Sequence, residues 1–251
     1  MLNDPWFYAV AVPAVLLAGI SKGGFGGGLG VLAVPLLSLQ VPPLQAAAIL
    51  LPILCLMDIF GALAYRRSFS VENLKILIPA GLLGVVLAAL SARWIDVAGT
   101  RLLIGLIAVG FALHYWLAPR QHRPRGVSRW KGGFWGAMGG FTSFIAHAGG
   151  PPLSVYLLPQ RLDKRLFVGT TVLFFITINY AKLIPYAWLG QFPTGNLLTS
   201  LVLAPLAPLG IRLGLWLRDR VSEVLFYRVC YVFLFFTGLK LLHGALGGWQ
   251  G

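Results

Sequence analysis

The sequence predicts an all-α polytopic membrane protein made of two inverted repeats, each a broken, re-entrant hairpin followed by three transmembrane helices. Three observations support this fold class. The first is composition: 58% of the 251 residues are hydrophobic, 11% are charged and the mean hydropathy is +0.81, whereas roughly a quarter of a soluble domain is charged. The second is a glycine-rich break within an apolar run in each half of the chain. The third is the distribution of basic residues between the apolar runs.

Eight apolar runs follow one another, and six of them have the length of one membrane crossing, about 17–25 residues. The runs cover residues 6–39, 44–65, 74–91, 102–118, 134–159, 166–189, 197–217 and 224–242. A basic linker, 119–131, divides the chain into a first membrane repeat, 1–118, and a second, 132–251. The halves are weakly similar: segment 84–90 of the third run resembles segment 210–216 of the seventh, and each has proline upstream.

The first break lies in run 6–39, where seven of the twelve residues 19–30 are glycine. Glycine loses much backbone entropy on folding and offers no side chain to pack, so a continuous helix is not expected there. A glycine-rich turn that opens a helix directs backbone N–H groups and the positive end of the helix dipole toward an anion. We therefore expect Gly24, Gly26, Gly27 and Gly28, followed by a half-helix over 29–39, to bind a substrate anion.

The second break spans residues 147–152, where Gly149 and Gly150 precede two prolines. Proline suits the first turn of a helix, so these glycines are expected at the N-terminus of a second half-helix. Interrupted hydrophobic segments at corresponding positions of two halves indicate a transporter's binding site, because irregular backbone in a membrane must be buried in protein or line a cavity. The alternative is close packing of helices through small residues.

Five polar side chains near the breaks or inside the runs are further candidates for substrate binding. A serine hydroxyl can donate a hydrogen bond to an oxyanion, and a lysine within a membrane is costly unless it is paired or used. The alternatives are a serine bonded to its own helix and a lysine that extends to the membrane interface. The five residues are Ser21, Lys22, Ser143, Asn179 and Lys182.

Two further residues are candidates for proton coupling. Asp58 lies in the second run, at a position that corresponds to Asn179 if the repeats align. A carboxylate in a membrane either takes up a proton or pairs with a cation such as a buried lysine. His147 precedes the second break, where a packed, hydrogen-bonded histidine is the alternative to a proton relay. Arg212, late in the seventh run, is expected to anchor its helix at the interface.

The basic residues distinguish two topologies. If all eight runs cross the membrane, each side receives eight of the lysines and arginines near the helices. If the two broken runs are re-entrant, one side receives fourteen and the other three, and the positive-inside rule favours this split. The rich side is then cytoplasmic and both termini are outside. The fourteen are Arg66, Arg67, Lys75, Arg120, Arg123, Arg125, Arg129, Lys131, Arg161, Lys164, Arg165, Arg218, Arg220 and Arg228.

Several classes of function are not expected. The sequence contains no HExxH, GxSxG or Walker motif, so we expect neither enzymatic activity nor a cofactor. Cys55 and Cys230 lie in different runs without CxxC spacing, and they indicate neither a metal site nor a redox pair. The net charge of +13 is expected to fix the topology and to contact anionic lipid rather than nucleic acid.

Residues 23–37, Gly-Gly-Phe-Gly-Gly-Gly-Leu-Gly-Val-Leu-Ala-Val-Pro-Leu-Leu, resemble the opening motif of the TauE/SafE sulfite exporter family. In the second half, Ser143, residues 148–152, residues 168–170, Asn179 and Gly190 resemble its companion motif. The resemblance covers nearly the whole chain. It implies a bacterial inner-membrane transporter of sulfite, organosulfonates or related sulfur oxyanions.

We therefore predict a secondary transporter that exports small sulfur oxyanions through a mid-membrane anion site formed by the two breaks. The breaks and the charge distribution predict an anion carrier, and the resemblance alone implies sulfur. A passive anion channel with the same pocket and an uptake permease for a related oxyanion are the alternatives. The expected partners are the small anionic substrate and the lipid bilayer.

Overall fold

The computed structural model describes residues 4–24, 30–65, 67–92, 94–117, 126–218 and 220–247, and its regular structure in these ranges is helical. The α-helices are α1 (Pro5–Gly24), α2 (Ala33–Leu37), α3 (Pro43–Tyr65), α4 (Val71–Ser91), α5 (Val97–Leu117), α6 (Arg129–Ala146), α7 (Gly150–Leu157), α8 (Lys164–Trp188), α9 (Thr194–Leu203), α10 (Leu206–Arg218) and α11 (Glu223–Gly247). Two 3-10 helices, η1 (Gly30–Leu32) and η2 (Leu158–Gln160), precede α2 and follow α7.

Seven segments of the described ranges are long and apolar enough to cross a membrane: α1, α3, α4, α5, α8, the combined α9–α10 segment and α11. The prediction of an all-α, multi-pass membrane protein is confirmed. The fifth run is divided into α6 and α7, as expected. The seventh run, expected as one crossing, is interrupted between α9 and α10 at Pro205, because proline has no N–H and its ring clashes with the preceding turn.

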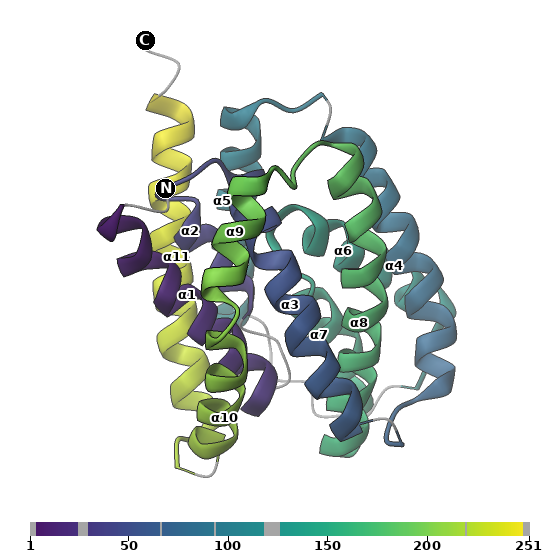
Figure 1. The fold of residues 1–251 in the computed structure, drawn as a ribbon. Coiled ribbons are helices and arrows are strands. Elements are labelled where there is room, and N and C mark those ends of the chain that lie inside the picture. Colours follow the sequence, from purple (N-terminus) through teal and green to yellow (C-terminus); the bar gives the residue numbers. More distant parts are fainter. Residues whose placement is uncertain are drawn as a thin grey trace.

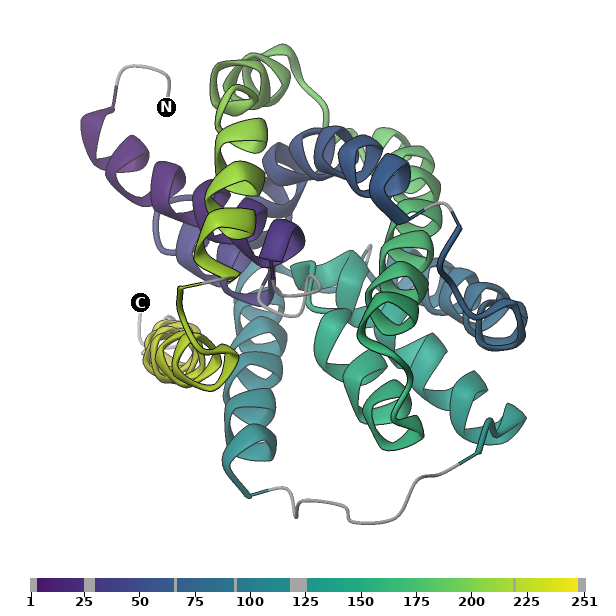
Figure 2. The ribbon, with the colours of Figure 1, turned by 90° about the horizontal axis from the view of Figure 1, so that it is seen from below.

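The two ends of the helix bundle contain different parts of the chain (Figure 1). Gln45 at the start of α3 donates a hydrogen bond of 2.9 Å to Asn196 at the start of α9, and α1 begins and α11 ends at this same end. We call it the terminal end. At the opposite end α3 ends and α8 begins, where Gly169 packs against the carbonyl of Ser68. We call this the linker end, because α6 begins there. Seen from below, α3 and α8 lie in the middle, with α5 and α11 on one side and α4 on the other (Figure 2).

Two segments return the chain to the end from which it came. α6 and α7 form a hairpin, since Gly132 near the start of α6 lies beside Tyr156 near the end of α7. α1 and α2 also contact each other, and α3 begins at the terminal end, where α1 began (Figure 1). Two interrupted helical segments are thus present, one in each half.

Glycines permit the closest contacts between helices. A Cβ on Gly19 of α1 would lie 2.8 Å from the Cα of Gly210 in α10. A Cβ on Gly84 of α4 would lie 2.0 Å from the carbonyl oxygen of Ala137 in α6. Small residues allow two backbones to approach in this way, and a larger side chain would force them apart. The α1–α10 and α4–α6 pairs therefore depend on glycine.

Helix α1 continues further into the first break than expected. It extends through Gly19 and Gly23 and ends at Gly24, although glycine disfavours a helix. The reason is tertiary: both Gly19 and Gly23 pack against the backbone of α10, and this contact compensates for their low propensity. In place of the predicted half-helix 29–39, the chain forms η1 and the short α2.

Candidate functional site

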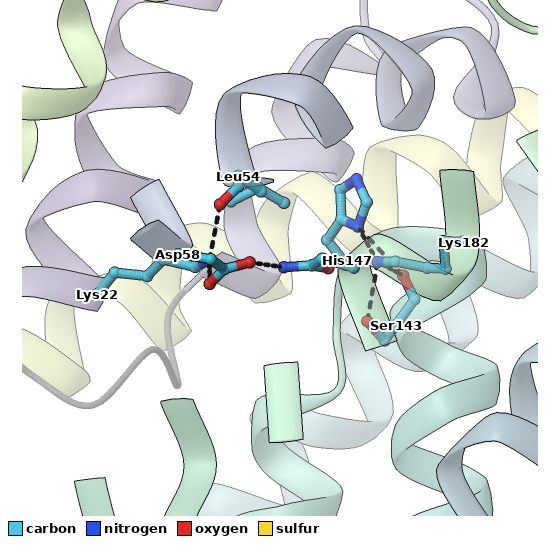
Figure 3. A network of polar contacts seen from close by, with 7 residues as sticks. Lys22, Leu54, Asp58, Ser143, His147 and Lys182 are labelled. Carbon is cyan, nitrogen blue, oxygen red and sulfur yellow. Dashed lines mark hydrogen bonds and ion pairs between the residues drawn. The ribbon is translucent and has the colours of Figure 1, made fainter. Parts of the chain in front are cut away.

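A line of polar side chains crosses the interior of the bundle between α1, α3, α6 and α8 (Figure 3). At one end of the line, the Nζ of Lys22 donates to Oδ1 of Asp58 and, at 3.2 Å, to the carbonyl oxygen of Leu54. The second carboxylate oxygen of Asp58 accepts a hydrogen bond of 2.6 Å from Nδ2 of Asn179. Asp58 and Asn179 are each 3% exposed and the Lys22 side chain is 16% exposed, so the carboxylate is buried and its lysine partner is partly open to solvent.

Lys182 lies at the other end of the line and is fully buried. Its Nζ donates to the carbonyl and hydroxyl oxygens of Ser143, both at 3.0 Å, and contacts Nδ1 of His147 at 2.8 Å. The Nε2 of His147 lies 2.9 Å from the carbonyl oxygen of Ala47. Nδ1 also lies 3.2 Å from the carbonyl oxygen of Ser143. We assign the ring proton to Nε2, because its contact with a carbonyl is the shorter one and the Lys182 ammonium can only donate, so Nδ1 accepts from Lys182. All three partners of Lys182 are therefore neutral acceptors.

The second break is formed by a left-handed residue that is not glycine. His147 follows α6 with a φ of 50°. Its N–H bonds to the carbonyl of Ser143 and the N–H of Ala148 bonds to that of Thr142, both at 3.1 Å. The first of these is the single bond of the αL motif at a helix C-terminus. The left-handed conformation costs roughly 1–2 kcal/mol in a residue with a Cβ. The two hydrogen bonds of the His147 ring stabilise it here.

Two backbone N–H groups at the second break, at the start of α7, are available to bind a ligand. Gly149 and Gly150 are buried, and their N–H groups have no hydrogen-bond acceptor among the residues that the structure describes. Pro151 and Pro152 follow and have no N–H to donate. Buried N–H groups without a partner are rare in proteins, and the start of a helix favours an anion. A Cβ on Gly149 would lie only 3.1 Å from the Cβ of Ser143, so this helix start is beside the residue that Lys182 contacts.

Two cavities lie at opposite ends of the line. The linker-end cavity, of about 370 Å³, is lined by α1, α3, α8 and α10, including Lys22, Asp58 and Arg212. The terminal-end cavity, of about 340 Å³, is lined by α3, α4, α5, α6, α9 and the segment before α9. Phe144, the neighbour of Ser143, lines this second cavity. The polar line therefore begins in the linker-end cavity, and the residue that follows Ser143 in the chain lines the terminal-end cavity.

The structure places most of the predicted site residues in this line. Asp58 pairs with Lys22 rather than with Lys182, which contacts Ser143 and His147. Ser21 is buried in the last turn of α1 and Gly24 ends that helix. Gly26, Gly27 and Gly28 lie outside the described residues. The six predicted residues that the structure brings together are Lys22, Asp58, Ser143, His147, Asn179 and Lys182.

Sequence analysis does not identify the backbone acceptors of the site. Three carbonyl oxygens of α3 accept hydrogen bonds from side chains of other helices: Ala47, Ile49 and Leu54 accept from His147, Ser200 and Lys22, respectively. Pro52 lies in the same helix and removes one backbone donor from its hydrogen-bond ladder. The missing N–H of Pro52 leaves the carbonyl of Ala48, which is none of these three, without its helical donor, so the sequence offers no signal for them.

Two residues of the companion motif position α8 and do not enter the line. A Cβ on Gly169 would lie 1.7 Å from the carbonyl oxygen of Ser68, so only glycine fits this approach. The Oγ1 of Thr170 accepts a hydrogen bond of 2.9 Å from the N–H of Ser70. Together these contacts fix the start of α8 against the segment between α3 and α4.

The chemistry of the site suits an anion. Its side-chain donors come from Lys22, Asn179 and Lys182, and its free backbone donors from Gly149 and Gly150. Within the described ranges, no three His, Cys, Asp or Glu side chains gather in a way that could hold a metal ion.

Buried charges between two cavities, beside two interrupted helices, define a class of protein: multi-pass membrane transporters. The model of the family described as sulfite exporter TauE/SafE matches residues 11–241, and the chain belongs to this family. The resemblance found in the sequence is confirmed. Membership implies transport of sulfur compounds across a membrane. Neither the comparison with curated proteins nor that with solved structures found a match.

Proposed function

We propose that the protein is a secondary transporter that exports small sulfur oxyanions, sulfite or an organosulfonate, through an anion site between its two helix breaks. The observation that supports this most is the charge of the interior. The polar line contains two lysines, the fully buried Lys182 and the partly exposed Lys22, and one carboxylate, Asp58. Burying a charge is costly unless a counter-charge accompanies it. A bound anion supplies that counter-charge.

The proposed anion contacts are Lys182, the Ser143 hydroxyl and the N–H groups of Gly149 and Gly150. These groups lie together, since α7 begins beside Ser143 and Lys182 bonds to that residue. The first break contributes Ser21, Lys22, Gly24, Gly26, Gly27 and Gly28 in this proposal. Mostly neutral donors around one centre suit a compact oxyanion, and they release it more readily than several arginines would.

We further propose that the halves are inverted repeats. The parallel contact between α1 and α10 corresponds to that between α6 and α4, and both rest on glycine. α3 packs against α8, and α5 against α11. Asp58 and Asn179, which correspond if the repeats align, hydrogen-bond directly to each other. This is the contact that two equivalent residues make where a twofold axis passes between them.

Two cavities at opposite ends of the bundle support alternating access. The polar line separates them. The linker end, with the basic residues, faces the cytoplasm of a bacterial inner membrane, and the terminal end faces outward. The substrate passes from the linker-end cavity, across the line, to the terminal-end cavity.

Asp58 and His147 are the proposed groups for proton coupling. Asp58 is held by Lys22 and Asn179, so taking up a proton would release the Lys22 ammonium. His147 connects Lys182 to the α3 backbone through its two ring nitrogens. A proton taken up by either group changes the charge beside the anion site.

A ligand panel on purified protein, read by thermal unfolding, tests this function. A ligand that binds only the folded state, at about a hundred times its Kd, adds roughly 2.7 kcal/mol. Sulfite or a short sulfonate should stabilise the protein more than chloride, nitrate or acetate at equal ionic strength. Ser21→Ala and Ser143→Ala should reduce this effect. Stabilisation by cations or neutral amino compounds, without a response to any sulfur oxyanion, would exclude the proposal.

A further inference from the structure

The linker-end cavity brings together two basic side chains from different helices. Lys22 of α1 and Arg212 of α10 both line it, and Asp58 is its one acidic lining residue. Asp58 is already bonded to Lys22 and Asn179. Arg212 forms no hydrogen bond or ion pair with any other residue in the described ranges. One positive charge of the cavity lining is therefore unbalanced.

The glycine contact between α1 and α10 explains why these two side chains share a cavity. Gly23, next to Lys22, is so close to α10 that a Cβ on it would lie 2.4 Å from the carbonyl oxygen of Ile211. Ile211 is in turn the neighbour of Arg212. With the backbones in contact at this level, the two adjacent basic side chains emerge on the same cavity wall.

Of the two lysines in the polar line, Lys22 faces this cavity and is the one accessible to solvent. The Lys22 side chain is 16% exposed, whereas Lys182 is fully buried. The terminal-end cavity has the opposite character, since Asp96 is its one charged lining residue. The Asp96 carboxylate accepts a hydrogen bond of 2.7 Å from the N–H of Gly99 at the start of α5. Electrostatic attraction of an anion is thus confined to the linker-end cavity.

We propose that the linker-end cavity is an anion-binding vestibule, in which Arg212 and Lys22 bind a small oxyanion or sulfonate before it reaches the interior line. This deepens the proposed function and rests on it for the identity of the transported anion. The planar guanidinium of Arg212 can donate two parallel hydrogen bonds to two oxygens of such an anion. A volume of about 370 Å³ accommodates the anion with part of its hydration shell. Arg212 is then a specificity-determining residue and not only an interfacial anchor.

The test uses charged thiol reagents, so that it does not depend on transport. Leu215 lines the same cavity and is exposed, and Leu215→Cys places a thiol there. An anionic sulfonatoethyl thiosulfonate and its cationic trimethylammonium counterpart are compared by their reaction rates with this thiol. Protein without Leu215→Cys gives the background, because Cys55 and Cys230 are both buried.

Adding Arg212→Gln should lower the anionic-to-cationic rate ratio by roughly fivefold to tenfold, the effect of removing one unit charge about 7 Å away in a water-like dielectric. Arg212→Lys should restore the ratio. The matched control is Arg220→Gln, since Arg220 lies at the same end but contacts Trp216 at 4.2 Å and does not line the cavity. Methanesulfonate, which does not react with the reagents, should slow the anionic reagent at Leu215→Cys, and Arg212→Gln should abolish this protection.

An unchanged anionic-to-cationic rate ratio in Arg212→Gln would overturn the proposed vestibule, because Arg212 would then exert no electrostatic effect in the cavity. An equal fall of the ratio in Arg220→Gln would also overturn it, because the effect would then come from the general surface potential. A ratio change without any protection by methanesulfonate would also overturn it. If the ratio and the protection behave as expected but no anion flux is found, the vestibule stands and the transport function fails.

Discussion

Lys22 of α1 and Asp58 of α3, 36 residues apart in the sequence, form an ion pair inside the helix bundle. The same carboxylate accepts a hydrogen bond of 2.6 Å from Asn179 of α8. Three helices from both halves of the chain therefore meet at one acidic group. Lys22 and Asp58 also line the linker-end cavity. A change in this contact would therefore alter both ligand binding in the cavity and the packing of the two halves.

Replacing Asp58 by Asn should destabilise the protein, since it leaves the Lys22 ammonium without its counter-charge. Breaking a buried ion pair costs about 3–5 kcal/mol, and the partial exposure of Lys22 places the expected loss near the lower value. Thermal or denaturant unfolding in detergent measures it. Asp96→Asn, at an exposed helix cap, is the control.

The double variant Lys22→Gln/Asp58→Asn tests whether the loss arises from the pair. Removing both charges leaves no unpaired ion, so the double variant should unfold at a higher temperature than Asp58→Asn alone. A coupling energy of about 1–3 kcal/mol is expected for groups in contact. If the two single effects simply add, the pair does not exist in the folded protein.

Replacing Gly84 by Ala should separate α4 from α6. A Cβ at this position would lie 2.0 Å from the carbonyl oxygen of Ala137, a backbone atom that cannot move aside alone. We expect a loss of about 3 kcal/mol, the upper part of the range for overpacking. Gly133→Ala in α6 is the matched control, because a Cβ there meets nothing within 4 Å. Equal folded yields for the two variants would contradict the packing.

The sequence predicted the helical class and the two breaks because these depend on local composition. Glycine content, tandem prolines and run length are visible without a structure. The division at Pro205 was missed, since Pro13, Pro52, Pro79 and Pro185 remain inside helices and proline alone does not determine which outcome occurs. The extent of α1 was also missed, because its glycines are stabilised by α10, which is remote in the sequence.

The members of the site could be selected from the sequence, but their pairing could not. Charged and polar residues within apolar runs are few, so Lys22, Asp58, Asn179 and Lys182 stand out. Which lysine pairs with Asp58 depends on how α1, α3 and α8 cross, and no residue spacing within one helix specifies that. The partners of Lys182 depend on the left-handed turn at the end of α6, which places a histidine where glycine is usual.

The first break can be tested although its central residues lie outside the described ranges. Gly26→Val or Gly27→Val should abolish transport and leave folded protein in the membrane, because a β-branched residue disfavours positive φ and blocks the approach of an anion to the backbone. Gly30→Ala is the control, since a Cβ at Gly30 has open space. Transport at a near wild-type rate in both valine variants would show that these amides do not bind the substrate.

The topology predicts that the linker is cytoplasmic and that the loop before α9 is outside. Gly126→Cys and Gly195→Cys are matched probes, because both positions are exposed and a side chain there meets nothing within 4 Å. An impermeant thiol reagent applied to intact cells should label the thiol at 195 and leave the one at 126 unlabelled until the membrane is opened. Labelling of both in intact cells, or of 126 alone, would refute this topology.

Counterflow of labelled sulfite into sulfite-loaded proteoliposomes tests the central claim most directly, because exchange through a carrier saturates with substrate whereas flux through a passive channel rises in proportion to its concentration. The wild-type protein should show saturable counterflow that a short sulfonate inhibits and chloride does not. Lys182→Met should reduce it about tenfold to a hundredfold, the loss expected for a hydrogen bond from a charged group. Lys240→Met, at an exposed position of α11, should leave it unchanged. Counterflow no greater than in protein-free vesicles, or flux that rises without saturation, would contradict a sulfur-oxyanion carrier.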